Sequence, residues 1–276
     1  MANSLATEYL RHSRRFLKYL DYCRSRLNEK NIHQLRTSLK RQLCFVKFYG
    51  LMAQQPDVLV EAKSAIAGIY KTAGAIREQQ LNSQLSQRLL ATTDKAYLRQ
   101  LEQAEQLYRE AMKQELAAFD TTSYRKQLSR MARRMRSASE ALLCRQAQAF
   151  VGQKVEKINQ LLSFRTDDER YHACRKHLKQ TAFMILYLGS AHGCMPLPDW
   201  GDRFKKIDLL IGHWHDCQQF QHSYNQAMRT HRQPHKPAPV LRAMRKLKRS
   251  NAKRIAALHR QLNRLLPALA QAYRTA

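Results

Sequence analysis

Apolar residues recur with a helical period along this chain. In the segment that starts at residue 31 they fall at intervals of three and four residues, at Ile32, Leu35, Leu39, Leu43 and Val46. This spacing places them on one face of an amphipathic helix, which is then buried. No segment shows the alternation of apolar and polar residues that indicates a strand. The pattern predicts an all-α protein.

Breaks between helices are predicted where helix-breaking and capping residues cluster. The chain has 8 glycines and 7 prolines, and residues 75–151 contain neither, which favours long helices. The predicted breaks are residues 28–31, 50–56, 92–94, 120–123, 166–168, 189–201 and 231–239. Three helices have candidate N-caps, namely Thr93 or Asp94, Thr122 or Ser123, and Asp167 or Asp168. We therefore expect about eight helices.

Two parts of the chain repeat each other. Residues 32–41 read IHQLRTSLKR and residues 171–180 read YHACRKHLKQ, at an offset of 139. Downstream, Gly74 and Glu78 recur as Gly212 and Asp216 at an offset of 138. Two signatures that keep nearly one offset indicate an internal duplication. We expect two four-helix units, residues 1–119 and 120–276.

A basic stripe occupies the polar side of the helix that starts at residue 31. At about 100° per residue, Arg36, Lys40 and Lys47 lie within about 60° of His33. A charged face is often only solvated, but the recurrence of this one in the second half of the chain favours a function.

Other basic stripes extend the pattern. Arg15 and Lys18 correspond at the same offset to Lys154 and Lys157. Further cations at three- and four-residue spacing are Lys126, Arg130 and Arg133, and then Arg242, Arg245, Lys246, Arg249 and Lys253. Because there are so many stripes, we expect some of them to be solvated surface only.

The net charge points to an anionic partner. The 276 residues include 49 Lys and Arg against 21 Asp and Glu, a formal net charge of +28. A hydrophobic content of 44% excludes intrinsic disorder. Charge of one sign on this scale repels itself and attracts polyanions. The candidate ligands are nucleic acid, a condensed phosphate polymer and anionic lipid headgroups.

The chain shows no signal for membrane insertion or secretion. It has no run of 18 apolar residues and no apolar stretch of signal-peptide length near its start. Its six cysteines have no zinc-ligand spacing and are expected to be reduced, small core or lining residues. We predict a cytoplasmic protein and leave its oligomeric state open.

The motifs resemble those of the CHAD domain, a family of conserved-histidine α-helical domains, over nearly the whole chain. The family pattern is His-x-x-Arg with Lys or Arg four residues on, then Gly-x-x-Arg-Asp, with the set repeated in the second half. The matching residues are His33, Arg36, Lys40 and Arg41, then Gly74, Arg77 and Glu78, then His172, Arg175, Lys176 and Lys179, then Gly212 and Asp216.

The resemblance implies two four-helix bundles related by a pseudo-two-fold axis, with a basic channel between them. It also implies binding of inorganic polyphosphate and, for some members, residence on polyphosphate granules. With the added stripes, the candidate polyphosphate-binding residues are Arg15, Lys18, His33, Arg36, Lys40, Lys47, Arg77, Lys154, Lys157, His172, Arg175, Lys176, Lys179, Arg242, Arg245, Lys246, Arg249 and Lys253.

Three positions depart from the family pattern. Glu78 stands where Asp is usual, and His215 stands where the first half has Arg77. Ala182 and Phe183 stand where an Arg-Tyr pair is common. These differences make the second half of the implied channel less basic than is typical.

The residue types suit a phosphate chain. Arginine offers a planar fork that meets two phosphate oxygens, and lysine acts as a movable point charge. Neighbouring cations lower the pKa of a histidine, so His33 and His172 are expected to be neutral in an empty channel and to take up protons when a polyanion binds. The alternative is that each histidine hydrogen-bonds to a neighbouring helix.

The sequence does not favour catalysis. Glu78 and Asp216 occupy equivalent repeat positions, which fits partners for basic side chains better than a metal site. There is no P-loop and no Glu-x-Glu-x-Lys strand. We expect no enzymatic activity, no cofactor and no metal.

Two nearby features have plain structural explanations. His213 and His215 point about 200° apart on a helix, so a shared metal is disfavoured. Trp214 is expected in the core, with His215 towards the channel and His213 outward. Cys44 lies within the basic stripe, where it is an activated thiolate or, as we favour, a buried bystander.

Two other functions use the same charge. A nucleic-acid binder would show the same affinity for phosphate, but the chain lacks a zinc finger, an aromatic RNA-binding strand and a Gly-x-x-Gly clamp. A scaffold or regulator would dock residues 242–253 onto an acidic protein or granule coat. Association with a membrane surface is a weaker possibility, because the apolar faces are needed inside the bundles.

Overall fold

The computed structural model describes residues 4–54, 56–89, 95–163, 168–190, 200–230 and 238–274. Within these ranges the regular structure is entirely helical, as predicted. The helices are α1 (Ser4–Ser25), α2 (Glu29–Ala53), α3 (Pro56–Leu89), α4 (Lys95–Ala118), α5 (Thr121–Ser137), α6 (Glu140–Leu162), α7 (Asp168–Ser190), α8 (Trp200–Thr230) and α9 (Ala238–Arg274). The described residues thus form nine helices where about eight were expected.

The additional helix arises from a break that contains neither glycine nor proline. Ala138 has an extended backbone, and the Ser139 side chain accepts a hydrogen bond from the Leu142 N–H, which caps α6. A serine side chain that accepts a backbone N–H of the first turn favours the start of a helix. The long stretch free of glycine and proline therefore holds a junction that the sequence pattern did not reveal.

The N-cap of α5 lies two residues before Thr122 and three before Ser123, the predicted caps. Asp120 is the cap, and its carboxylate accepts the backbone N–H groups of Thr122 and Ser123, each at 2.9 Å. The candidates Thr93, Asp94 and Asp167 lie outside the described residues. Asp168 is the first residue of α7.

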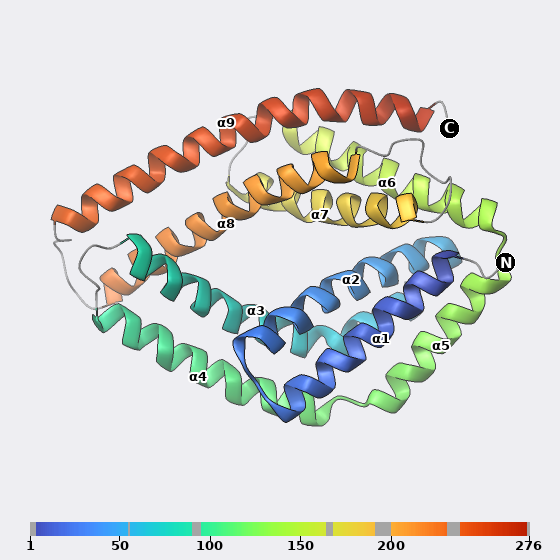
Figure 1. Ribbon diagram of the computed structural model, residues 1–276, viewed down its shortest axis with the longest axis horizontal. Coiled ribbons are helices and arrows are strands. Elements are labelled where there is room, and N and C mark those ends of the chain that lie inside the picture. The colour runs from blue at the N-terminus through green and yellow to red at the C-terminus, as the bar shows by residue number, and fades with distance from the viewer. Residues whose placement is uncertain are drawn as a thin grey trace.

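The helices form two groups that meet in the middle of the molecule. In Figure 1, α1–α5 fill the lower part and α6–α9 the upper part. Across the middle, α2 contacts α6 and α7, and α3 contacts α8. Helix α5 packs against α1 and α3. The division of the chain at residues 119 and 120 stays a prediction.

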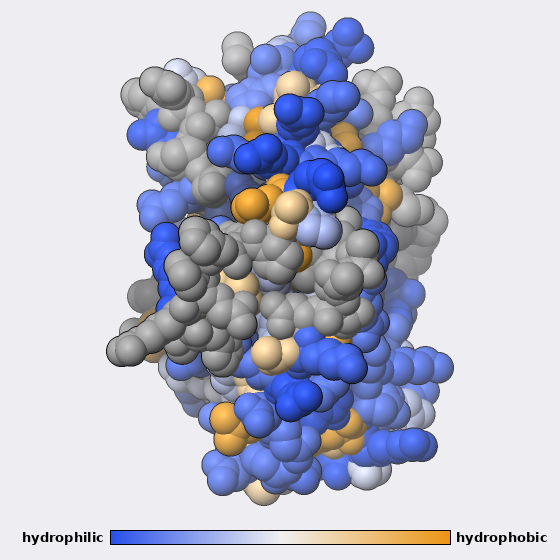
Figure 2. All heavy atoms as spheres, turned by 90° about the vertical axis from the view of Figure 1, so that its left-hand side faces the viewer, coloured by the Kyte–Doolittle hydropathy of each residue, from blue (hydrophilic) through white to orange (hydrophobic). Residues whose placement is uncertain are grey.

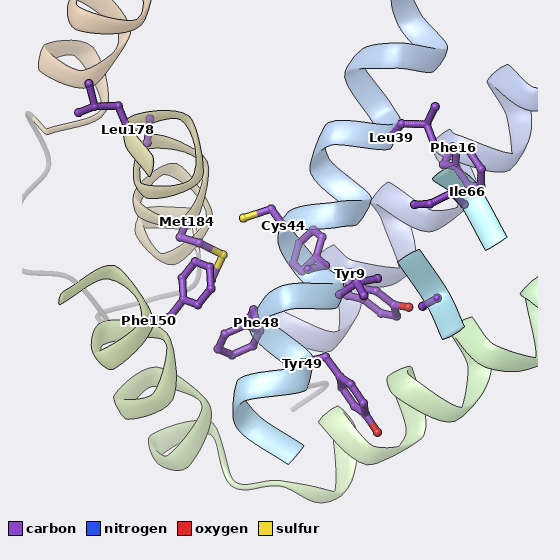
Figure 3. Packing of buried hydrophobic residues seen from close by; sticks show 14 of the residues in the cluster. Tyr9, Phe16, Leu39, Cys44, Phe48, Tyr49, Ile66, Phe150, Leu178 and Met184 are labelled. Carbon is purple, nitrogen blue, oxygen red and sulfur yellow. The ribbon is translucent and has the colours of Figure 1, made fainter. Parts of the chain in front are cut away.

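Aromatic rings join the two groups. The main core is one cluster with members from all nine described helices. Phe45 on α2 makes edge-on contacts with Tyr9 on α1, at 5.4 Å between ring centroids, and with Phe183 on α7, at 5.3 Å. Figure 3 shows Phe48 on α2 facing Phe150 on α6, and Cys44 pointing towards α7. These contacts hold α2 firmly against α6 and α7.

A smaller core lies at one end of the molecule. Tyr97 on α4 makes an edge-on contact with Tyr224 of α8, at 5.0 Å between ring centroids, and donates a hydrogen bond to Ser223 at 2.9 Å. Leu85 of α3 and Val240 of α9 complete the contact. Figure 2 views this end, where hydrophilic residues cover most of the described surface and hydrophobic ones form only small spots.

The cysteines differ in part from the expectation. Cys23, Cys44, Cys174 and Cys217 are free and buried, as expected of core residues. Cys144 is disulfide-bonded, so the prediction that all six are reduced is wrong at this position. None of the helices, over the residues described, has an apolar stretch long enough to cross a membrane.

Phe45 tests the aromatic core. Its ring is fully buried among residues of α1, α2 and α7, so Phe45→Ala should lower the free energy of unfolding by about 3–5 kcal/mol. Leu107→Ala is the control, because Leu107 is 72% exposed and its loss should change stability by less than about 0.5 kcal/mol. Denaturant unfolding measures both, and equal stabilities would contradict the role given to Phe45.

Candidate functional site

Helices α2 and α7 bring four cations from distant parts of the chain together. We call Arg36, Lys40, Arg175 and Lys179 the central basic cluster. The charges of Arg36, Arg175 and Lys179 all act on Lys40, and Arg36 and Arg175 act on one another. These are the residues that the repeated motifs picked out in the sequence. The structure thus unites the two stripes, which lie 139 residues apart.

Helices α3 and α8 flank this cluster. A Cβ atom added at Gly74 would stand 3.7 Å from Arg36 Nε, so the backbone of α3 runs beside this guanidinium. Asp216 of α8 is the leading charge that acts on Arg175, and it acts on Arg36 as well. Glu78 of α3 also interacts electrostatically with Arg36. The charges of both carboxylates therefore act on the arginines, and their role as orienting partners stays a prediction.

Crowding and desolvation change the chemistry of Lys40. Partial burial, followed by the charges of Arg36, Lys179 and Arg175, lowers the pKa of Lys40 to about 6. A lysine side chain ordinarily titrates near pH 10.4. Lys40 is therefore mostly neutral at pH 7.5 in the empty site, because the fold buries it among other cations. An anion bound beside Lys40 would raise its pKa again.

The two arginines keep unused donors inside the site. Arg36 Nε and Arg175 Nε are buried and have no hydrogen-bond partner among the described residues. Burial also lowers the pKa of both guanidinium groups. A buried donor without an acceptor costs free energy, and an oxyanion would satisfy it. The matching orphaned donors on α2 and α7 therefore mark a place for an anion.

Few carboxylates neutralise the cluster. Lys179 Nζ lies 3.0 Å from one carboxylate oxygen of Asp208 on α8 and 3.3 Å from the other. Sequence reasoning missed Asp208, and it missed Tyr70 of α3, which interacts electrostatically with Arg36 and Arg175. Positions 70 and 208 differ by 138, the offset of the downstream repeat, but tyrosine and aspartate are different residue types, so the repeat gave no signal for either.

Histidines extend the site. The Nδ1 atoms of His172 on α7 and His215 on α8 lie 3.4 Å apart. Desolvation, with Arg175 and His172 as the leading charges, lowers the pKa of His215 to about 3. Partial desolvation and neighbouring cations also lower the pKa of His33 and His172. All three rings are therefore neutral near pH 7.

Comparison with known proteins places this arrangement in a family. The sequence model of the CHAD domain matches residues 8–225. This chain belongs to the CHAD domain family. The match identifies a CHAD domain and no catalytic domain.

Two solved structures share the fold. The crystal structure of the CHAD domain from the plant Ricinus communis superposes with a TM-score of 0.67 at 14% sequence identity, over 95% of this chain and 91% of that chain. PptA from Streptomyces chartreusis superposes with a TM-score of 0.65 at 15% identity, over 95% of this chain and 98% of that chain. No curated protein matches the chain.

One motif residue of the CHAD domain is already paired. Arg77 forms an ion pair with Glu29 at 2.5 Å and donates a hydrogen bond to Gln80 at 3.2 Å. It still lies close enough to His33 to lower the pKa of that ring. Arg77 therefore stands at the edge of the site, where an incoming anion would compete with Glu29.

The departures from the CHAD pattern have structural reasons. Phe183 packs its ring against His12 and Phe45, so this position serves the aromatic core. Ala182 is buried as well. His215 contributes its ring to the site next to His172, in the place where the first half has Arg77.

His213, Trp214 and Cys44 lie where the sequence predicted them to be. Trp214 is buried and His213 is exposed. Burial raises the pKa of the Cys44 thiol to about 12, so it is a protonated bystander. Within the described ranges, no three His, Cys, Asp or Glu side chains come together as metal ligands.

Other predicted residues of this CHAD domain lie away from the central basic cluster. Arg15 and Lys18 are exposed on α1, over the rings of Tyr19 and Tyr22. Lys157 is exposed on α6 and donates to Gln160. The α9 stripe lines a shallow surface depression of about 610 Å³ along one helix, formed by Arg242, Arg245, Lys246, Arg249, Ser250 and Lys253. Their role in binding stays a prediction.

Lys47, Lys154 and Lys176 form a separate group. They line a pocket together with Lys63 of α3 and His177 of α7. Sequence reasoning missed Lys63, which lies outside the repeated segments, and His177, which lies inside one but corresponds to Ser38 at the offset of 139. Only the packing of α3 and α7 against α2 and α6 brings them to this place.

Lys40 tests the electrostatic strain in the site. The folded protein lowers its pKa, so Lys40 destabilises the fold below pH 10.5 and does so most strongly below pH 6. Lys40→Met keeps much of the side-chain stem and should raise the melting temperature by about 2 °C or more at pH 6. The gain should shrink as the pH rises towards 10.

Lys95→Met, at an exposed position of α4, is the matched control and should give no such pH-dependent gain. Calorimetric melting at a series of pH values measures both variants. A Lys40 variant that is less stable than the wild type at pH 6 would contradict the assigned strain.

Proposed function

We propose that this CHAD domain binds inorganic polyphosphate without catalysis, in a channel lined by the central basic cluster. The observation that carries the proposal is the pair of buried, unpartnered Nε donors on Arg36 and Arg175 beside a lysine whose pKa is about 6. Each of these features is unfavourable in an empty site and is relieved by a phosphate chain.

The proposed channel follows from the repeat. We infer that the two units are related by a pseudo-two-fold axis and that the helices with the His-x-x-Arg motifs, α2 and α7, face each other across it. Arg36 and Arg175 then meet the chain as equivalent forks, while Lys40 and Lys179 act as point charges. A ligand with a uniform backbone and no bases suits such equivalent contacts. Residence on polyphosphate granules is part of the same proposal.

Selectivity is expected to come from enclosure. The arginine donors are buried between helices, whereas a DNA duplex presents its phosphates on a wide convex surface. A bare phosphate chain is narrow enough to reach such donors. The exposed α9 stripe would still hold DNA weakly, with strong dependence on salt.

The first experiment measures binding of medium-chain polyphosphate at near-physiological salt. The double variant Arg36→Gln and Arg175→Gln should lose about 100-fold in affinity, because two charge-assisted contacts disappear. The control is Arg14→Gln with Arg145→Gln, which removes the same charge from exposed positions and should change affinity less than about threefold. Both doubles are compared with the wild type.

Duplex DNA serves as the competitor in the same assay. Displacement by DNA at equal phosphate concentration, with indifference to the Arg36 and Arg175 changes, would replace this proposal by general nucleic-acid binding. Loss of granule recruitment after charge reversal of residues 242–253, with unchanged polyphosphate affinity, would assign a scaffold role to α9.

Proton uptake tests the proposed state of Lys40. At pH 8 it is neutral in the free protein, and a bound polyanion should raise its pKa, so binding should take up about one proton. Titration calorimetry in buffers of different ionisation enthalpy measures this number. Lys40→Met should abolish the uptake at pH 8. Below neutral pH, uptake by His33 and His172 should appear in addition.

A further inference from the structure

A second concave basic site lies beside the contact between α2 and α7. Its cations come from four helices, and we call it the lysine pocket: Lys47 of α2, Lys63 of α3, Lys154 of α6, and Lys176 and His177 of α7. The pocket is open to solvent and has a volume of about 650 Å³. Sites for small molecules typically span about 300–1,000 Å³.

The lysine pocket and the central basic cluster are separate. Between them α2 touches α7, where the Cys44 thiol points at the carbonyl oxygen of Gln180 at 3.8 Å. Cys44 is buried, so this contact leaves no open passage at that point. The leading charges that act on Lys47 are those of Lys154 and Lys63, both in the lysine pocket. The neighbours of Lys40 belong to the central basic cluster.

The pocket gathers positive charge without neutralising it. Among the described residues, its lining includes no carboxylate. It does include three glutamines, Gln54, Gln153 and Gln180. Desolvation and neighbouring lysines lower the pKa of Lys47 and His177. Lys154 Nζ lies over the ring of Phe150, 4.9 Å from its centroid. The lysines are therefore held close together at an electrostatic cost.

One buried polar atom adds to this argument. The Nδ1 atom of His177 is buried and has no hydrogen-bond partner among the described residues. The helical backbone around His177 is satisfied, since its carbonyl accepts a hydrogen bond from Thr181. A ring nitrogen without a partner at the wall of a basic pocket is a group that a ligand could satisfy.

We propose that the lysine pocket is a second anion site, which takes a compact cluster of phosphate groups. Lysines that converge from four helices can surround three or four adjacent phosphates, with the glutamine amides as further donors. The ligand is either a free short oligophosphate or the end of a longer chain. The inference goes beyond the proposed function, because it holds whether or not the central basic cluster binds polymer.

The test uses sodium tripolyphosphate as the probe and titration calorimetry on the full chain. The double variant Lys47→Gln and Lys154→Gln should weaken binding at this site by about tenfold or more. The control is Lys95→Gln with Lys248→Gln, which removes the same charge from exposed positions of α4 and α9 and should change affinity less than about twofold. Equal effects of the two doubles would overturn the proposal.

The central variant Arg36→Gln with Arg175→Gln separates this proposal from the previous one. If both sites bind phosphate, this variant still binds tripolyphosphate at the lysine pocket and no longer binds long-chain polyphosphate. Loss of tripolyphosphate binding in this variant would mean that the probe binds only the central basic cluster, which overturns the second site alone.

An NMR measurement at the lysine pocket distinguishes a loss of binding from misfolding of the variant. In the central variant, the NMR signals of the His177 ring should shift on addition of tripolyphosphate, and the absence of any shift would contradict the proposal. Long-chain polyphosphate then distinguishes the two sources. A weaker long-chain affinity in the Lys47 and Lys154 variant identifies a chain end, and an unchanged one identifies a free short oligophosphate.

Discussion

Aromatic packing around α2 presses cations of two helices together, and the rest of the site depends on this forced proximity. Phe45 contacts α1 and α7, and Phe48 faces Phe150 of α6. Buried rings contribute large amounts of apolar area, so α2 and α7 cannot move apart without loss of core packing. Arg36 and Arg175 are therefore held close together although their charges repel.

The consequence is an empty site under electrostatic strain. Lys40 loses its proton near pH 6, three histidines remain neutral near pH 7, and two guanidinium donors lack partners among the described residues. Proteins commonly accept such local cost where a ligand later relieves it, because the relief adds to binding. The charges of Asp208, Asp216 and Glu78 offset part of the repulsion between the basic side chains.

The two basic sites differ in chemistry. The central basic cluster relies on a pair of arginines, whose planar forks suit directional contacts with oxygens. The lysine pocket has no arginine among its described lining residues, and its flexible point charges suit a compact ligand of variable orientation. The exposed stripes on α5 and α9 differ from both, because each lies on one helix and faces solvent, where salt screens its charges.

The sequence by itself determined the helical class, the repeat of His33, Arg36 and Lys40 at an offset of 139, and the excess of positive charge. These are local or compositional properties, and periodicity reports them directly. It did not reveal the junction at Ala138 and Ser139, because a single capping serine resembles any surface serine.

Only the tertiary structure decided which of the many cations share a site. Arg15 and Lys18, three residues apart, share one helix face just as Arg36 and Lys40, four residues apart, do, yet they lie on the exposed side of α1. Asp208, Lys63 and His177 acquire their places from helix packing, since their neighbours are remote in sequence. Burial and pKa depend on these remote neighbours, so spacing along one helix could not distinguish a site from a solvated face.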